Sequence, residues 1–262
     1  MNQLPKLHQE ANGQGYPLVV LHGLFGDTDN FRSISLHLER YFQVIRIDLP
    51  GHGHSETMAK YDFETMADAV LNHLSKAGIN EFHLLGHSLG GKVAMQMAGT
   101  KTELFVNKLV VVDIAPRLYP PHHAMILDAL NQLQLDEINS RSDAEKRLRL
   151  QIPDAGVRGF LLKSLHRDDD NNWQWRFDLS GLTANYEAIR LPPSFAQTVA
   201  AATLFVKGGV SDYLDAQDEP VIRNHFKEPH FKEIGGAGHW PHAEKPAQFT
   251  RICLEFLNQK IV

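Results

Sequence analysis

Short apolar runs alternate with amphipathic stretches along the first 115 residues of the chain. The first run, at 18–21, is apolar on both faces, as a central strand of a parallel sheet is. Helices are expected at 30–40 and 63–77, and the second has an apolar stripe with Asp62 as N-cap and Gly78 as stop. Further strands are predicted at 44–47, 82–85 and 109–112. This alternation is typical of βαβ units.

The pattern changes between Pro116 and Pro193. No strand-like apolar run is found in this segment, and the spacing of apolar residues predicts helices at 127–133 and 144–150. The acidic stretch 168–170 is typical of a solvated loop. Residues 116–193 are therefore expected to form a mainly helical insertion.

Two further strand–helix units complete the predicted fold. A strand is expected at 204–206 and another at 230–234, and the last helix begins near Pro246. We therefore predict an α/β core made of residues 1–115 and 194–262, with a mostly parallel central sheet flanked by helices. The insertion is expected to cap this core.

Composition narrows the class of protein. The 262 residues carry a net charge of −5, which argues against a nucleic-acid partner because such proteins gain affinity from basic residues. The single cysteine, Cys253, lies in an apolar helical pattern and is expected to be a buried hydrophobic residue. Residues 1–15 lack the pattern of a signal peptide, and no apolar run reaches about 18 residues, so we expect a cytoplasmic protein without a membrane span.

A serine stands where a strand is predicted to run into a helix. The sequence GHSLG at 86–90 fits the G-x-S-x-G pattern, in which the serine occupies a strained turn and the glycines leave room for the backbone. Such a turn lifts the Ser88 hydroxyl above the sheet and directs the Leu89 N–H at a developing oxyanion. The alternative is an ordinary glycine turn, but the flanking elements and a downstream histidine favour catalysis.

Two loops at predicted strand ends offer the partners that such a serine needs. The loop HGLFG at 22–26 is expected to supply a second oxyanion donor, the Leu24 N–H, although it could be a simple glycine turn. His239 lies just after the last predicted strand, where a general base can reach Ser88. The other fourteen histidines lack this context.

The triad acid has two candidates, because it should lie between Ser88 and His239 in the chain. Asp212 is in the loop after the strand at 204–206, next to Ser211 in an ordinary polar turn. Asp113 ends the strand beside the nucleophile strand and is isolated in an apolar run. A buried carboxylate needs a partner. We therefore favour Asp113 over Asp212.

Other chemistries have weaker support. The histidine pairs at 52 and 54 and at 239 and 242 lack the third and fourth ligands of a zinc site, and no phosphate-binding glycine loop is present, so neither a metal nor a cofactor is expected. An aromatic row could line an acyl pocket, but we favour packing of the insertion: Trp173, Trp175 and Phe177.

The order of these motifs resembles the α/β-hydrolase superfamily over nearly the whole chain: HGLFG at 22–26, DLPGHGHS at 48–55, GHSLGG at 86–91 and GAGHW at 236–240. Within it, four further motifs resemble the YbfF-type bacterial esterases: VDIAP at 112–116, FLLKS at 160–164, WRF at 175–177 and GHWPHAEKP at 238–246. The resemblance implies an α/β core with a helical cap, hydrolysis of short acyl esters or thioesters including acyl-CoA, and Ser88 and His239 as catalytic residues. This chain differs from generic α/β-hydrolases in one respect: it has Ser211 at the position where they place the triad acid.

The sequence therefore predicts a serine hydrolase of small acyl esters or thioesters that works through an acyl-enzyme on Ser88. Within the same fold, pyruvate-eliminating lyases of menaquinone synthesis and carbon–carbon hydrolases are alternatives, because they share the GHSLGGKVAM and DLPGHGHS patterns. A non-catalytic small-molecule receptor is disfavoured because nucleophile, base and oxyanion donors are all present. Ser88 at the turn excludes a carboxylate nucleophile. The oligomeric state and the natural acyl group are left open.

Overall fold

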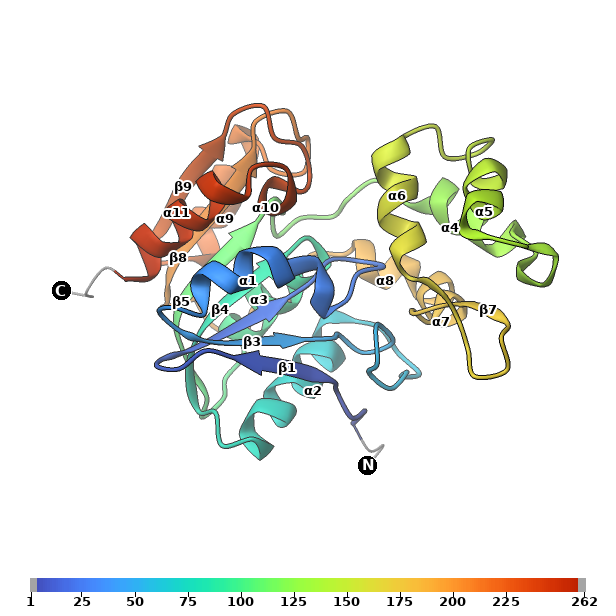
Figure 1. Cartoon of the computed structure of the whole chain (residues 1–262). Coiled ribbons are helices and arrows are strands. Elements are labelled where there is room, and N and C mark those ends of the chain that lie inside the picture. Colours follow the sequence, from blue (N-terminus) through green and yellow to red (C-terminus); the bar gives the residue numbers. More distant parts are fainter. Residues whose placement is uncertain (1–3, 259–262) are drawn as a thin grey trace.

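The computed structural model describes residues 4–258, and its central feature is a seven-stranded sheet (Figure 1). The strand order is β1-β3-β2-β4-β5-β8-β9, and every neighbouring pair is parallel except β1 and β3. The strands are β1 Gln9–Asn12, β2 Pro17–Leu21, β3 Gln43–Ile47, β4 Glu81–His87, β5 Phe105–Val112, β8 Ala202–Gly208 and β9 Pro229–Ile234. The predicted fold class, a mostly parallel sheet flanked by helices, is confirmed.

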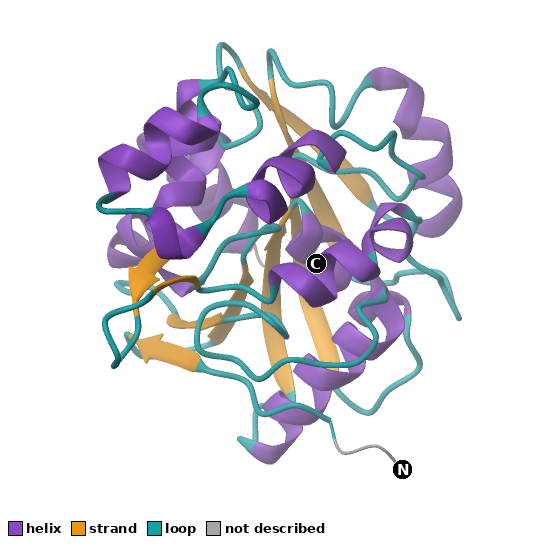
Figure 2. Ribbon diagram, turned by 90° about the vertical axis from the view of Figure 1, so that its right-hand side faces the viewer, coloured by secondary structure: helices purple, strands orange, loops and turns teal. Residues whose placement is uncertain are grey.

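Helices cover both faces of this sheet (Figure 2). The helices α2, α3 and α9 contribute buried side chains to the larger apolar cluster on one face, whereas α1 and α11 pack together on the other. A short helix, α10, precedes α11. Their bounds are α1 Arg32–Leu38, α2 Phe63–Lys76, α3 Leu89–Gly99, α9 Glu219–His225, α10 Pro241–Glu244 and α11 Pro246–Leu257.

The local sequence accounts for the helix ends that position the site. Asp62 caps α2 by accepting from the Thr65 N–H at 2.8 Å, as predicted. Cys253 is buried within α11, also as predicted. The helix α3 starts directly after Ser88 and is buried along almost its whole length, which fixes the turn before it on a rigid support.

Between β5 and β8 the chain leaves the sheet and forms a separate layer of short elements, seen on the right of Figure 1. These are α4 Ala124–Gln132, α5 Arg141–Leu148, α6 Ala155–Lys163, β6 Leu165–Arg167, β7 Trp173–Trp175, α7 Leu179–Ala184 and α8 Tyr186–Arg190. We call residues 116–193 the insertion segment. Three single-turn 3-10 helices complete the description: Thr28–Phe31, Leu135–Glu137 and Ala216–Asp218.

The expectation that the insertion segment contains no strand is wrong. The strands β6 and β7 form an antiparallel pair with Leu165 opposite Trp175. The turn between them is closed by Asn171, which adopts φ 67°, and by the Asn172 N–H, which donates to the Asp168 carboxylate at 2.8 Å. Three residues per strand are too few to produce an apolar run, which is why the pattern did not reveal them.

Hydrogen bonds join the insertion segment to the core at several places. The Tyr61 hydroxyl donates to Asp178 at 2.7 Å. The Ser164 hydroxyl donates to the carbonyl of Phe25 at 2.9 Å. The Lys92 ammonium donates to the carbonyls of residues 190 and 191 at 2.9 and 2.7 Å, at the end of α8. Among residues 4–258, no helix is long and apolar enough to cross a membrane.

Candidate active site

Ser88 occupies a strained turn between β4 and α3. Its backbone has φ 51° and ψ −115°, in the left-handed region that non-glycine residues rarely adopt. Neighbouring segments of the backbone approach so closely here that both flanking positions require glycine. A Cβ at Gly86 would lie 2.2 Å from the Gly90 carbonyl oxygen, and one at Gly90 would lie 2.4 Å from the His22 carbonyl oxygen. The turn is the strand–helix elbow that the sequence predicts.

His239 lies between Ser88 and a buried carboxylate. Its Nε2 is 3.0 Å from Ser88 Oγ, and its Nδ1 is 2.8 Å from Asp113 Oδ2. Because the carboxylate only accepts, Nδ1–H donates to Asp113 and the Ser88 hydroxyl donates to Nε2. The imidazole ring stacks on Tyr213 with centroids 3.8 Å apart. The His87 ring donates from Nε2 to the His239 carbonyl at 2.8 Å and so fixes the loop.

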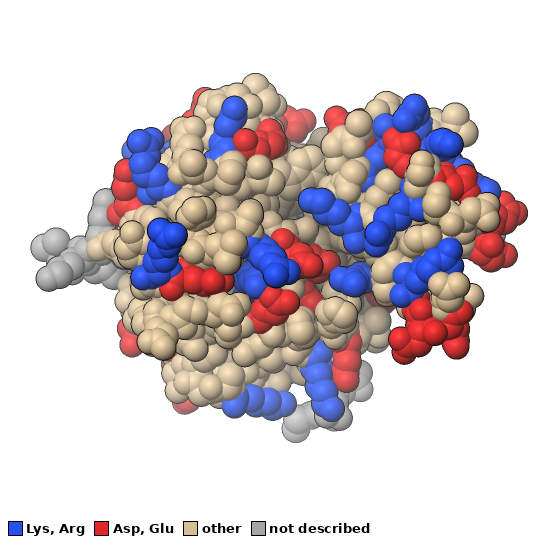
Figure 3. Space-filling model, in the orientation of Figure 1, with Lys and Arg blue, Asp and Glu red and all other residues tan. Residues whose placement is uncertain are grey.

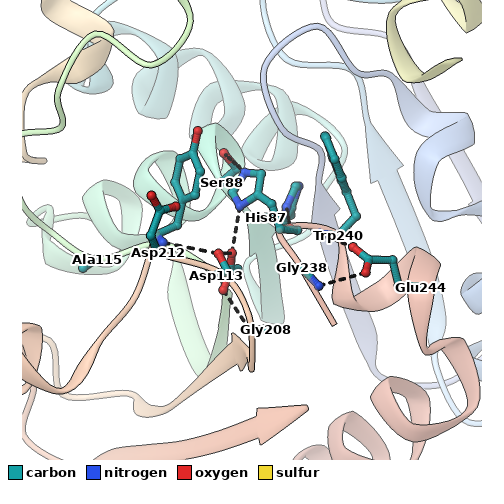
Figure 4. A network of polar contacts seen from close by, with 12 residues as sticks. His87, Ser88, Asp113, Ala115, Gly208, Asp212, Gly238, Trp240 and Glu244 are labelled. Atoms are coloured by element: carbon teal, nitrogen blue, oxygen red, sulfur yellow. Dashed lines mark hydrogen bonds and ion pairs between the residues drawn. The ribbon is translucent and has the colours of Figure 1, made fainter. Parts of the chain in front are cut away.

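Asp113 is fully buried at the end of β5, and its carboxylate is surrounded by donors. One oxygen accepts from the Gly208 N–H at 2.8 Å, and the other accepts from His239 and from the Ser211 hydroxyl. Figure 4 shows Asp113 at the centre of this network, with Ser88 above it and Gly208 below. These bonds satisfy the charge that burial would otherwise make costly.

The structure brings Ser88, His239 and Asp113 together and leaves the alternative acid outside this chain of contacts. Asp212 is exposed, and within residues 4–258 its side chain contacts neither Ser88 nor His239; its carbonyl accepts from Arg117 at 3.2 Å. The residue that sequence reasoning missed is Ser211. Its position, where generic members of the superfamily carry the acid, was the available signal.

The two predicted oxyanion donors lie on either side of the nucleophile. Leu24 and Leu89 both line a small pocket with Ser88, and their N–H groups donate no hydrogen bond within the described part of the chain, residues 4–258. The first loop is shaped by His22, whose Nε2 accepts from the Leu49 N–H at 2.9 Å and whose Nδ1–H donates to the Gly23 carbonyl at 2.8 Å. Burial lowers the pKa of His22 to about 4, so the ring is neutral.

Ser88 lies where two cavities meet. The small pocket has a volume of about 40 Å³ and is lined by apolar side chains such as Ile114 and Ile189, together with polar ones such as Lys92. The second is a cleft of about 1250 Å³ between the core and the insertion segment. The aromatic row of the insertion lines neither cavity: Trp175 stacks on Phe177, which contacts Phe25 at 5.0 Å between ring centroids. Packing, the favoured interpretation, is therefore correct for this row.

The histidine pairs considered as metal ligands have other surroundings. His242 is buried and stacked on Phe31, and His52 donates from Nδ1 to the Pro50 carbonyl. Burial lowers the pKa of both rings to about 3. Among residues 4–258, no three side chains of the His, Cys, Asp or Glu type are grouped so that they could hold a metal ion.

A serine on a strand–helix turn, at the carboxyl edge of a mostly parallel sheet and facing a loop histidine, defines the α/β-hydrolase class. The family model described as alpha/beta hydrolase fold matches residues 16–178. The chain therefore belongs to the α/β-hydrolase superfamily, and the resemblance predicted from its motifs is confirmed.

Individual relatives are similar over most of their length. The sn-1-specific diacylglycerol lipase ABHD11 of Danio rerio is 36% identical, with 95% of this chain and 80% of the relative covered. Esterase YbfF of Escherichia coli is 31% identical, with 92% and 93% covered. A solved marine microorganism esterase has 33% identity and a TM-score of 0.92, with 96% and 99% covered. This similarity supports carboxylester hydrolysis as the activity of the chain.

Proposed function

We propose that this protein is a serine hydrolase that cleaves short acyl esters or thioesters through an acyl-enzyme on Ser88. One observation carries the proposal: a continuous chain of hydrogen bonds runs from Asp113 through His239 to Ser88, and it ends where the two cavities meet. This is the geometry in which a weak hydroxyl nucleophile is activated by a base that a carboxylate orients.

The first half of the reaction transfers the acyl group to the enzyme. His239 Nε2 takes the Ser88 proton while Oγ bonds to the acyl carbon, and Asp113 stabilises the resulting imidazolium. The carbonyl oxygen becomes an anion that the N–H groups of Leu24 and Leu89 are placed to stabilise. The tetrahedral intermediate then breaks its bond to the leaving oxygen or sulfur, which receives the proton from His239.

The second half restores the enzyme. His239 Nε2 takes a proton from water, whose oxygen attacks the acyl carbon bound to Ser88. A second tetrahedral oxyanion forms against the same N–H groups and breaks the bond to Oγ, which regains its proton from His239. The carboxylic acid product leaves, and the residues described here need no cofactor for either step.

The shapes of the two cavities support a short acyl group and a larger leaving group. The pocket of about 40 Å³ has room for only a few water-sized groups, so it suits an acetyl or propionyl chain. The cleft of about 1250 Å³ is large enough for a drug-sized leaving group. We assign the acyl chain to the small pocket, and the alcohol or thiol, coenzyme A included, to the cleft. In this assignment residues 116–193 act as a cap on a core of 1–115 and 194–262.

The nucleophile is tested by Ser88→Ala. This variant should lose roughly a thousandfold or more in kcat on p-nitrophenyl acetate, because only binding and the oxyanion donors are left. A fluorophosphonate probe should label the wild-type protein on Ser88 and should not label the variant. Ser75→Ala, on the exposed face of α2, is the matched control. Wild-type turnover in purified Ser88→Ala protein would refute the acyl-enzyme.

The acyl assignment is tested with p-nitrophenyl esters and acyl-CoA thioesters of increasing chain length. We expect kcat/KM to be highest for two or three carbons and to fall as the chain outgrows the small pocket. A maximum at long chains would place the acyl group in the cleft instead. Turnover of the oxygen esters without the thioesters would restrict the enzyme to carboxylesters.

A further inference from the structure

Two basic side chains of the insertion segment line the wide cleft and form no ion pair within residues 4–258. Arg176 follows β7 and is half-buried, and its Nε is shielded from solvent with no acceptor among residues 4–258. Lys163, the last residue of α6, is exposed and forms no ion pair within the described residues. In Figure 3 basic side chains gather on the margin of the right-hand lobe, beside the hollow that separates it from the core.

The acidic residues that line the same cleft are already engaged. Asp27 caps the 3-10 helix Thr28–Phe31 by accepting from the Asp29 N–H at 3.0 Å, and Asp29 lies 3.6 Å from Arg32. Across the cleft, Glu244 accepts from two backbone N–H groups of the His239 loop, at 2.8 and 3.2 Å. Figure 4 shows Glu244 turned toward Gly238. These carboxylates hold loops, and none of them forms an ion pair with Arg176 or Lys163. The charge of Asp27 interacts with that of Arg176 through space, without a hydrogen bond between the two side chains.

A buried guanidinium N–H without an acceptor is costly, because its desolvation is compensated only when a hydrogen bond replaces water. The planar fork of the guanidinium matches carboxylate and phosphate groups, which accept two parallel hydrogen bonds. The cleft extends from Ser88 to Arg176, on the side to which we assign the leaving group. An anion on the leaving group would therefore lie in the part of the cleft that Arg176 lines when the acyl end occupies the small pocket.

We infer that Arg176, assisted by Lys163, binds an anionic group, a carboxylate or a phosphate, on the leaving-group side of the substrate. The inference rests on the proposed serine hydrolase and narrows its substrates to esters or thioesters of negatively charged alcohols or thiols. Arg176 is thus a specificity-determining residue that binds away from the reacting atoms.

The test uses phenyl acetates whose para substituent is either anionic or neutral. They are 4-acetoxybenzoate, 4-acetoxyphenyl phosphate and neutral methyl 4-acetoxybenzoate, each rate being divided by that of alkaline hydrolysis. Wild type should favour the anionic esters by about tenfold or more, through KM, because a charged hydrogen bond contributes that much. Arg176→Gln should remove the preference and leave the neutral ester unchanged, whereas Lys163→Gln should weaken it less.

Comparison of the carboxylate with the phosphate ester identifies which anion the cleft prefers. Arg251→Gln is the matched control: it removes the same charge from an exposed position on α11. High salt should reduce turnover of the anionic esters alone. Equal kcat/KM on charged and neutral esters, or an equal loss on all three in Arg176→Gln, would overturn the inference.

A binding measurement tests the anion site independently of the proposed hydrolysis. The product 4-hydroxybenzoate should bind the Ser88→Ala protein, and Arg176→Gln in that background should weaken its Kd by about tenfold. Hydrolysis of the neutral ester without an anion preference would refute only the anion site. Anion binding that depends on Arg176, with no ester turnover in wild type, would refute only the hydrolase.

Discussion

Asp113 combines a strained backbone with a completely buried side chain. It has φ 51°, which an aspartate adopts at a cost, and its carboxylate is completely buried. Three donors compensate for this: the Gly208 N–H, the Ser211 hydroxyl and the His239 ring. Held in this conformation, the carboxylate directs one oxygen at His239 Nδ1.

Substitution of each candidate in turn distinguishes Asp113 from Asp212 as the triad acid. Asp113→Asn should lower kcat on p-nitrophenyl acetate by roughly a thousandfold to ten-thousandfold, because an amide no longer holds His239 with its proton on Nδ1. Asp212→Asn should stay near wild type, because that side chain is exposed. Melting curves of both variants provide the folding control. A large loss in Asp212→Asn with an active Asp113→Asn would move the role to Asp212.

Ser211 should act on the rate through Asp113. Ser211→Ala removes one of three donors to the carboxylate, and we expect kcat to fall about five- to thirtyfold, which corresponds to one or two kcal/mol, with KM unchanged. Ser211→Thr keeps the hydroxyl and should restore most of the rate. If both variants lose the same activity, or if only KM rises, Ser211 does not position the acid.

At the scale of elements, one hydrogen bond couples the end of α6 to the loop at 22–26, which carries the oxyanion donor Leu24. The Ser164 hydroxyl holds the carbonyl of Phe25, which has φ 65° and follows Leu24 directly. Ser164→Ala should therefore lower kcat about three- to tenfold and weaken binding of a trifluoromethyl ketone analogue, since a looser loop stabilises the oxyanion less well. Ser180→Ala, exposed on α7, is the control. Unchanged kcat would show that the loop keeps its shape unaided.

The central strands were predictable from the sequence because their side chains are buried. Strands β2, β4 and β5 each contain a buried and mainly apolar run because both faces of the sheet are covered. The edge strand β1, with the sequence QEAN, has no such run; it is held by backbone pairing with β3, and its composition alone does not reveal this. The strands β6 and β7 also lack an apolar run, so the sequence did not predict them either.

The candidate site was predictable where position along the chain determines position in space. Ser88 and His239 follow strands, so the carboxyl edge of the sheet brings them together. The choice between Asp113 and Asp212 depends on which side chain of the loop after β8 turns inward, and there Ser211 points to Asp113 while its neighbour faces solvent. Arg176 could not be predicted, because its place depends on how the insertion segment packs on the core.

At the scale of the whole molecule, the chain buries a set of neutral histidines. Burial lowers the pKa of His22 to about 4 and the pKa of three others to about 3: His52, His123 and His242. It also lowers the pKa of His87 well below the ordinary value. In the unfolded chain these rings take up protons near pH 6.5, whereas the folded protein does not.

Acid should therefore destabilise the fold. The unfolded state binds more protons below pH 6.5, so the free energy of unfolding is highest above that pH and falls as pH drops toward 4, by about 1.4 kcal/mol per pH unit for each such histidine. Urea midpoints measured from pH 7.5 to 4.5 should decrease steeply. His242→Phe should reduce this slope and exposed His230→Gln should not. Constant midpoints down to pH 5 would contradict the argument.

The bond from Lys92 to the end of α8 has a mechanical consequence. Lys92 is one helical turn from Ser88, and on the other side the Tyr119 hydroxyl ties the start of the insertion segment to the Tyr213 carbonyl. Lys92 and Tyr119 both line the small pocket, so two of the attachments that hold the insertion segment to the core also form part of the wall of that pocket. A substitution that loosens either attachment should therefore change the shape of the acyl pocket at the same time. The bonds from Tyr61 to Asp178 and from Ser164 to Phe25 lie outside this pocket, so the insertion segment can be loosened there without altering the pocket wall.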